Sequence, residues 1–291
     1  MPFFDFVEIG TSDFDTELQA AGPNERGLSI DPLQVYLDRL PDKPNCTKFC
    51  AAVSDSVGEI DVYSLPPDRI QKLGMGRWIR GCNSVGAPHP TVVRQLRRRG
   101  LNPDELIVAS KVEMIDFLTL AQRFSIEGIN FLKVDTEGHD HIILHSYCDL
   151  IENKPELKAH RIKFESNVLT TPENVTAIRQ RLIGLGYEVA HTTAQDTIMV
   201  LQFEQMDASY QPIDRSHPEI EAAGPFDGYY LKGYPPGYRL NSHPNTLVDA
   251  LIVARRMKAG GVTLQNGRYE VRGRKLIQLR GCGAISWVVK L

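Results

Sequence analysis

The sequence predicts a mainly parallel, doubly wound α/β sheet that finishes on an antiparallel pair of strands and is followed by a small α+β module. Three observations lead to this prediction. Short apolar runs alternate with helical patterns, the last two runs (187–191 and 197–203) are joined by a short turn, and the composition changes after residue 228. Alternating strands and helices are typical of a parallel sheet, whereas a short connection joins antiparallel strands.

The bulk composition suits such a fold. The chain has 291 residues, of which 42% are hydrophobic, enough for a sizeable core. No apolar run approaches the ~20 residues of a transmembrane helix, and no basic and apolar leader opens the chain. Five scattered cysteines without a C-x-x-C pair argue against a disulfide scaffold or a structural zinc site. We expect a soluble, cytoplasmic protein without a membrane span.

Charge divides the chain into two parts. The formal net charge is −3, but residues 229–291 hold 11 Lys and Arg against 2 Asp and Glu, a net charge of +9, so the preceding residues carry −12. Such asymmetry suggests two units with different surfaces. We predict a large domain at 1–203, a linker rich in Pro, Asp, Glu and Gly at 204–228, and a small basic accessory module at 229–291.

The first two predicted strands suggest a nucleoside site. Strand 3–9 ends at Gly10, and the buried Glu8 needs a partner such as a ligand ammonium or turn amides. Strand 27–31 ends in Asp31, where an acid accepts hydrogen bonds from ribose hydroxyls in nucleoside-binding folds. A loop with one glycine lacks the G-x-G-x-x-G that cradles a pyrophosphate. S-adenosylmethionine (SAM) fits this pattern, and a plain βαβ turn with a surface Asp also explains it.

The rest of the large domain is read from its periodicity. We expect strands at 46–53 and 129–135, an edge strand at 58–63, and a strand at 160–165. We expect helices at 33–40, 112–123 and 172–185, and an irregular stretch at 65–103 that ends in a basic helix with Arg94, Arg97, Arg98 and Arg99. Ligands of such folds bind beyond the carboxyl ends of the strands, where we place Gly10, Asp31, Asp55, Asp135 and Glu165.

The basic module shows its own pattern. We expect a helix at 246–258, a hairpin around Asn266-Gly267 and a final strand at 285–289. Its basic residues are interleaved with aromatic ones, namely Tyr229, Tyr230, Tyr234, Tyr238 and Trp287. Such aromatics bind single-stranded nucleic acid, stack on sugar rings or form the core of a small module. The sequence leaves these three roles open.

The segment 130–140, Asn-Phe-Leu-Lys-Val-Asp-Thr-Glu-Gly-His-Asp, resembles the F-L-K-I-D-V-E-G-x-E signature of FkbM-type SAM-dependent methyltransferases. Segments 7–10, 29–32, 52–59 and 114–118 resemble other blocks of that family in the same order, so the resemblance covers about 4–203. The chain departs from the family in its 10–14 loop and in having Asp140 for Glu. Stretches 65–105 and 204–291 lie outside the resemblance. The two-part chain also resembles glycan-decorating proteins of large algal viruses.

The resemblance implies a class I (Rossmann-like) methyltransferase fold that transfers the SAM methyl group to a hydroxyl of a small molecule or sugar. It also implies a set of cofactor contacts. The methionine part of SAM would be bordered by Glu8, Gly10, Thr11, Ser12 and Asp13, the ribose by Asp31, and the adenine by Ala52, Val53 and Asp55. Asp135 would lie beside the transferred methyl group.

Transfer to an alcohol requires removal of its proton, so a base or a metal is expected near the acceptor. The candidates are Asp135, His139 and Glu165, with helix capping as the structural explanation for the first two. Asp135 and Glu165 at neighbouring strand ends can also share Mg²⁺ or Mn²⁺, which prefer oxygen ligands. His141 and His145 are spaced i,i+4, but without a nearby third ligand a surface role explains them better.

The sequence thus predicts a SAM-dependent O-methyltransferase that acts on a hydroxyl of a carbohydrate, either a glycan or a sugar intermediate. One alternative is a non-catalytic glycan-binding or assembly protein on a methyltransferase scaffold. Another is a nucleic-acid methyltransferase anchored by the basic tail, although the chain has no Asn-Pro-Pro-Tyr motif. We regard nucleic acid as an unlikely partner, and a nicotinamide oxidoreductase as least compatible with the single-glycine loop.

Overall fold

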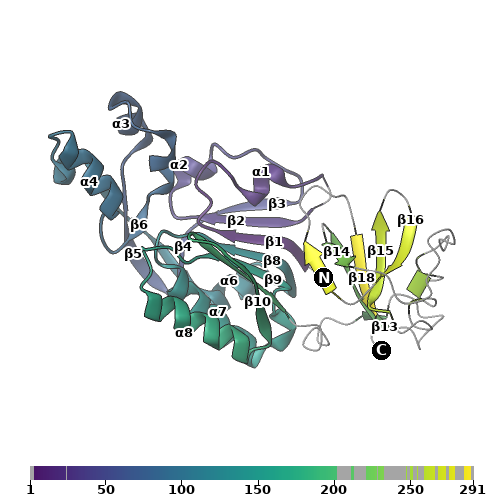
Figure 1. The fold of residues 1–291 in the computed structure, drawn as a ribbon. Coiled ribbons are helices and arrows are strands. Elements are labelled where there is room, and N and C mark those ends of the chain that lie inside the picture. Colours follow the sequence, from purple (N-terminus) through teal and green to yellow (C-terminus); the bar gives the residue numbers. More distant parts are fainter. Residues whose placement is uncertain are drawn as a thin grey trace. The chain divides into compact units, whose positions relative to one another are not determined.

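In the computed structural model, seven strands form a sheet in the order β3-β2-β1-β8-β9-β11-β10 (Figure 1). The chain divides into two compact units, Met1–Gln202 and Phe203–Leu291. The structure describes residues 3–23, 25–201, 211–212, 221–227, 229–232, 247, 250–251, 254, 259–265, 268–272, 275–278 and 285–289.

The large sheet is mostly parallel, as the sequence predicts. Its strands are β1 (Phe3–Ile9), β2 (Gly27–Asp31), β3 (Cys46–Cys50), β8 (Gly128–Val134), β9 (Arg161–Glu165), β10 (Tyr187–Thr192) and β11 (Asp196–Leu201). β1 pairs in parallel with β2 and β8, whereas β11 runs antiparallel to β9 and β10. This arrangement is compatible with a Rossmann-like fold.

Strand β8 shows why the central strands form as predicted. All seven of its residues are buried, because a central parallel strand is covered on both faces. Its sequence is therefore mainly apolar and does not alternate between apolar and polar residues. Ile9 lies opposite both Ile30 and Val134, so the carboxyl ends of β1, β2 and β8 reach the same edge of the sheet. The loops that follow these three strands are therefore neighbours.

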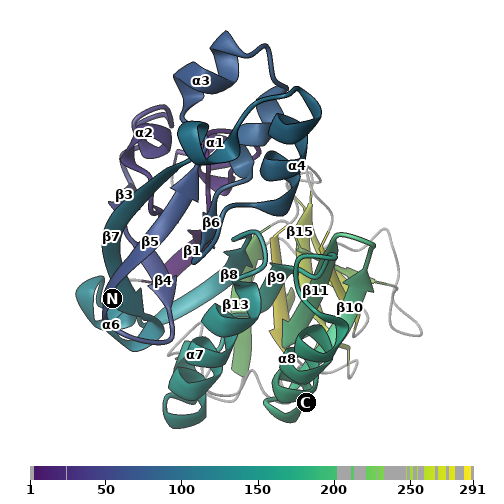
Figure 2. The same cartoon turned by 90° about the vertical axis from the view of Figure 1, so that its left-hand side faces the viewer.

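Helices connect and cover the strands of this unit. They are α1 (Glu17–Ala20), α2 (Gln34–Leu37), α5 (Pro103–Leu106), α6 (Phe117–Arg123), α7 (Asp140–Asn153), the 3₁₀ turn η2 (Pro155–Leu157) and α8 (Pro172–Gly184). Figures 1 and 2 show α6, α7 and α8 side by side, in agreement with their mutual contacts. Helix α8 begins at its cap, Thr171, whose side chain accepts a hydrogen bond from the amide of Asn174.

A second sheet of the same unit corrects three predictions. Its order is β4 (Ala52–Ser54), β7 (Val108–Asp116), β5 (Gly58–Ser64), β6 (Ser84–Val85). The single strand expected at 46–53 is two strands in different sheets, and β5 is an interior strand rather than an edge. The helix expected at 112–123 starts only at Phe117, because residues 108–116 alternate in exposure and Asp116 caps the helix through the amide of Thr119.

The stretch 65–103, which we call the cap segment, is not irregular as predicted. It contains α3 (Pro67–Lys72), the 3₁₀ helix η1 (Arg77–Gly81), β6 and α4 (Pro90–Arg98), and its basic helix is confirmed. Figures 1 and 2 show α3 and α4 to one side of the large sheet. The segment has its own small apolar core, made of Leu65, Ile70, Ile79, Cys82, Val92 and Leu96.

The second unit is built mainly of antiparallel strands. They are β12 (Gln211–Pro212), β13 (Glu221–Asp227), β14 (Tyr229–Lys232), β15 (Gly261–Gln265), β16 (Arg268–Arg272), β17 (Lys275–Gln278) and β18 (Ile285–Val289). The hairpin of β15 and β16 and the final strand lie where the sequence predicts them. β12 and β13 fall within the segment expected as a linker, and β13 pairs with β18.

Two aromatic residues of this unit, Trp287 and Tyr269, belong to its apolar core. Trp287 is buried in an apolar cluster, and its ring centroid lies 6.1 Å from that of Tyr269. The described residues of the expected helix at 246–258, including Ala250 and Leu251, are helical and belong to the same cluster. Tyr234 and Tyr238 lie outside the described residues, and so do the side chains of Tyr229 and Tyr230.

Candidate functional site

The loop after β1 lies against the end of β8. Gly10 has φ +83°, and a Cβ built on it would lie 1.9 Å from the carbonyl oxygen of Asp135. The amide of Asp135 in turn donates to the carbonyl of Ile9. Only glycine combines this backbone conformation with so close an approach, so Gly10 sets the turn that begins the predicted cofactor loop.

Asp31, at the end of β2, holds that loop in place. One carboxylate oxygen accepts the amide of Ser12 and the other the amide of Leu33, each at 2.8 Å. Burial raises the pKa of Asp31 to about 6. Since a carboxylate offers about four acceptor positions, each oxygen keeps room for a further donor such as a ribose hydroxyl.

Glu8, one of the predicted cofactor contacts, finds its partners inside the protein. It is fully buried, and Lys133 Nζ lies 2.9 Å from its Oε1. The amide of Glu17, at the start of α1, lies 3.1 Å from both carboxylate oxygens. Lys133 also donates to the carbonyl of Asp15. The pair fixes both ends of the loop, and Lys133 is a residue that the sequence analysis missed.

The remaining loop residues contact the cap segment. Asp13 is buried and forms ion pairs with Arg39 and Arg80, each at 3.1 Å. The Ser12 hydroxyl donates to the carbonyl of Arg80, and the buried Thr11 hydroxyl donates to the carbonyl of Ser12. The loop and the cap segment therefore form one connected structure.

The predicted adenine side is formed by β4. Ala52 and Val53 are buried, whereas Asp55 is exposed and accepts hydrogen bonds from the hydroxyls of Ser54 and Ser56. The hydroxyl of Ser54 lies 2.9 Å from Nε2 of His139, the residue before α7. Burial lowers the pKa of His139. The structure thus brings His139 to the end of β4.

Asp140 ties together the ends of β8 and β9. It is fully buried, accepts the amide and hydroxyl of Thr136 at 3.0 and 2.7 Å, and accepts the amide of Glu165 at 2.9 Å. Burial raises its pKa to about 6. The position at which the chain departs from the family signature therefore has a structural role here.

The two predicted catalytic carboxylates differ in environment. The side chain of Asp135 is 43% exposed, with Oδ2 4.0 Å from Lys133 Nζ. Burial, followed by repulsion from Glu137, Asp140 and Asp135, raises the pKa of Glu165 to about 9. Near neutral pH Glu165 therefore carries a proton and can donate a hydrogen bond, whereas Asp135 presents an accessible acceptor.

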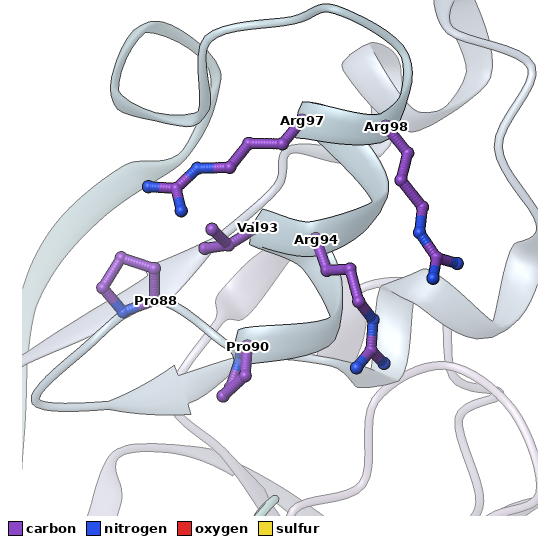
Figure 3. A pocket seen from close by; sticks show the side chains of 6 residues that line it. All are labelled: Pro88, Pro90, Val93, Arg94, Arg97 and Arg98. Atoms are coloured by element: carbon purple, nitrogen blue, oxygen red, sulfur yellow. The ribbon is translucent and has the colours of Figure 1, made fainter.

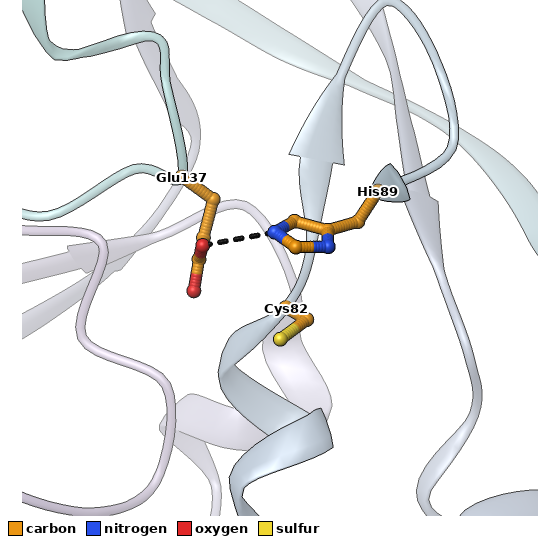
Figure 4. A group of neighbouring side chains, drawn as sticks. All are labelled: Cys82, His89 and Glu137. Atoms are coloured by element: carbon orange, nitrogen blue, oxygen red, sulfur yellow. Dashed lines mark hydrogen bonds and ion pairs between the residues drawn. The ribbon is translucent and has the colours of Figure 1, made fainter. Parts of the chain in front are cut away.

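Glu137, which the sequence analysis passed over, is held by the cap segment (Figure 4). Its Oε2 lies 3.0 Å from Nε2 of the buried His89. The amide of Thr91 donates to Nδ1 of His89 at 3.1 Å, so Nδ1 carries no proton. His89 therefore has its proton on Nε2 and donates it to Glu137. Because His89 and Glu137 are 48 positions apart, no local pattern could reveal this pair.

A comparison of the sequence with models of protein families gives one result. The model of the FkbM methyltransferase domain matches residues 7–189. The chain belongs to the FkbM methyltransferase family. The matched range includes the cap segment, whereas the stretch 65–105 was expected to lie outside the resemblance. No curated protein and no solved structure gives a significant match.

The FkbM methyltransferase domain also contains a group of potential metal ligands. Ligand atoms of Cys82, His89 and Glu137 lie within 4.8 Å of one another among the described residues (Figure 4). A histidine that binds a metal donates its other ring N–H to a neighbour. Nδ1 of His89 instead accepts an N–H, so the group as it stands is a hydrogen-bonded His–Glu pair beside a thiol. The predicted shared ion at Asp135 and Glu165 stays a prediction.

One further expectation concerns the membrane. Within the described parts of the FkbM chain, every helix is too short or too polar to span a bilayer.

Proposed function

We propose that this FkbM protein is a SAM-dependent O-methyltransferase that acts on a hydroxyl of a carbohydrate. The observation that carries the proposal is the position of Asp31: it ends β2, is buried, and binds the amide of Ser12 in the single-glycine loop. An acid so placed suits the hydroxyls of a nucleoside, and a loop without further glycines suits a ligand without a diphosphate. Within a methyltransferase family, the nucleoside with these properties is SAM.

The residues around this edge fit SAM. The turn at Gly10 leaves no space even for a Cβ, and Asp31 keeps free acceptor positions. We assign the methionine part to the loop formed by Gly10, Thr11, Ser12 and Asp13. Glu8 stabilises this loop through its ion pair with Lys133. We assign the ribose to Asp31, and the adenine to the residues at the end of β4, Ala52, Val53 and Asp55. Bound SAM supplies an electrophilic methyl group on a sulfonium.

The protein must then orient the acceptor hydroxyl and remove its proton. We propose that Asp135 borders the transferred methyl and that Glu137 accepts the proton. His89 occupies one oxygen of Glu137 and thereby fixes its direction, which leaves Oε1 for the acceptor. Glu165, protonated near neutral pH, donates a hydrogen bond to an acceptor oxygen. His139 contacts the hydroxyl of Ser54 and thereby helps to position the end of β4.

Trp78 supports a carbohydrate acceptor. Its side chain lies on η1 in the cap segment and is 49% exposed, although most large apolar side chains of this unit are buried. A large aromatic side chain that is half exposed is suited to cover the apolar face of a sugar ring. It lies two positions before Arg80, which contacts the predicted cofactor loop.

Calorimetric titration with SAM and its demethylated product, S-adenosylhomocysteine, tests the cofactor. We expect wild type to bind both, and Asp31→Asn to lose affinity about tenfold or more, while the exposed control Asp42→Asn binds like wild type. Transfer of labelled methyl from SAM to a panel of sugars then tests the acceptor. A folded wild-type protein that binds neither compound would refute the proposal and favour the non-catalytic scaffold.

A further inference from the structure

The cap segment is strongly basic. Residues 65–103 contain eight Lys and Arg but only one acid, Asp68, so they carry +7 while the rest of the chain carries −10. This charge lies in the part of the domain that contacts the predicted site, through Arg80 to Asp13 and through His89 to Glu137. A positive surface there attracts an anionic ligand toward the site.

Three of these cations surround a hollow (Figure 3). Arg94, Arg97 and Arg98 of α4, with Val93 and two prolines, line a space of about 660 Å³. The opposite face of α4 places Val92 and Leu96 in the core of the cap segment. The arginines are therefore directed outward by a helix that is itself anchored. The volume lies within the range of pockets for small ligands.

The structure gives these arginines no carboxylate partner. Other arginines of this unit do have one, such as Arg80 with Asp13 and Arg123 with Glu113, but within the described residues no ion pair includes Arg94, Arg97 or Arg98. Like charges three and four positions apart destabilise a helix. The helix C-terminus favours Arg97 and Arg98, but Arg94 lies outside the last turn. Stability therefore does not explain the cluster.

The hollow adjoins the site. Pro88 and Pro90, which form its wall, flank His89, and the ring of His89 holds Glu137. The wall of the hollow and the histidine of the His89–Glu137 pair are therefore built from consecutive residues of the chain. The two rings also restrict the backbone on both sides of His89, so the wall is rigid.

We propose that this arginine hollow binds a tetrahedral oxyanion, a phosphate or sulfate ester carried by the acceptor sugar. Guanidinium groups bind such oxyanions through paired N–H donors. The role in acceptor selection rests on the proposed methyl transfer, whereas anion binding itself does not. The ester anchors the sugar in the hollow, and a hydroxyl elsewhere on the sugar is presented to Glu137.

Titration calorimetry at low salt, with glucose 6-phosphate, glucose 6-sulfate, inorganic phosphate and glucose as probes, tests the proposal. We expect wild type to bind one or both esters but not glucose. The triple variant Arg94→Gln/Arg97→Gln/Arg98→Gln should lose ester affinity at least about tenfold with unchanged SAM affinity and melting temperature. A control with the same charge change elsewhere in this unit, Lys111→Gln/Lys154→Gln/Arg179→Gln, should bind the esters like wild type.

The two esters also identify the source of the anion. Binding of glucose 6-phosphate alone identifies a phosphate ester, binding of glucose 6-sulfate alone identifies a sulfate ester, and binding of both shows that the hollow accepts either. Equal losses in the triple variant and the control would reduce the effect to net charge and overturn the proposal. No ester binding at millimolar concentration would overturn it as well. So would binding of single-stranded RNA or DNA, added as a further probe, with steep salt dependence when neither ester binds. SAM binding without ester binding refutes this inference only, whereas ester binding without SAM binding refutes the proposed function.

Discussion

Lys133 Nζ lies 2.9 Å from Oε1 of Glu8, and both side chains are almost completely buried. The two residues belong to neighbouring strands, β8 and β1, where they are paired in register. Burial of a charged pair is costly unless each member finds the other. The pair therefore holds the predicted cofactor loop, and each member is stable in its buried position only while the other is present.

Removal of one member should unfold the loop. We expect Lys133→Met to destabilise the protein by about 3–5 kcal/mol, since Glu8 is left buried without its counter-charge. The double variant Glu8→Gln/Lys133→Met should recover most of this loss. Urea unfolding measures both values. Lys111→Met, which breaks the exposed 4.0 Å pair with Asp61, should change stability by less than about 1 kcal/mol. Equal effects of the two single variants would contradict this account.

Gly10 should tolerate no side chain. Gly10→Ala places a Cβ against the carbonyl of Asp135 and strains the backbone. We therefore expect the free energy of unfolding to fall by about 3 kcal/mol or more, and SAM binding to be lost. Gly86→Ala is the matched control: its φ is +78°, but no atom lies within 4 Å of the added Cβ. It should cost about 1–2 kcal/mol through its backbone alone. Thermal unfolding compares them, and equal losses would show that the contact with Asp135 is unimportant.

Glu165 should make stability depend on pH. Its pKa is about 9 in the folded protein against 4.5 as its ordinary value, so the group favours folding below pH 4.5 and this contribution is lost as pH rises toward 9. Glu165→Gln lacks this titration. Relative to wild type, the variant should gain about 4 kcal/mol of stability between pH 5 and pH 8.

Unfolding curves at several pH values measure this difference. The exposed Glu156→Gln should follow wild type at every pH. A constant difference between wild type and Glu165→Gln would show that Glu165 is ionised throughout.

The His89–Glu137 pair should matter for turnover. With a methyl acceptor from the sugar panel, Glu137→Gln should lower kcat by about 10²–10⁴ and leave SAM affinity unchanged. His89→Gln should lower kcat less, because it only positions the carboxylate. Cys82→Ala should retain kcat, since the thiol takes no part in proton removal. If a metal occupied this group, all three variants would instead lose the same bound metal, which elemental analysis of the purified proteins detects.

Much of the fold follows from local sequence. Strands β1, β2, β8 and β9 lie within a residue of their predicted bounds, because each is an apolar run that ends at a glycine or an acid. Gly10 and Asp31 were identified for the same reason: a turn conformation and a strand end are local properties. The 130–140 signature likewise lies on one strand and its turn, and the family comparison confirms the prediction made from it.

Features that depend on contacts between distant segments could not be predicted from the local sequence. Residues 108–116 contain a helix-like pattern at their end, yet they form β7 because β4 and β5 offer hydrogen-bonding partners on both sides. The cap segment looked irregular because its short elements are stabilised by a core that only their folding assembles.

The sequence by itself therefore determined the main strands of the large sheet, the glycine turn, the acid at the end of β2 and the family. The tertiary structure decided the partners: Lys133 for Glu8 across 125 positions, and His89 for Glu137 across 48. The physical reason is that backbone propensity and periodicity act over a few residues. The environment of a buried charge depends instead on which distant segments the topology brings beside it.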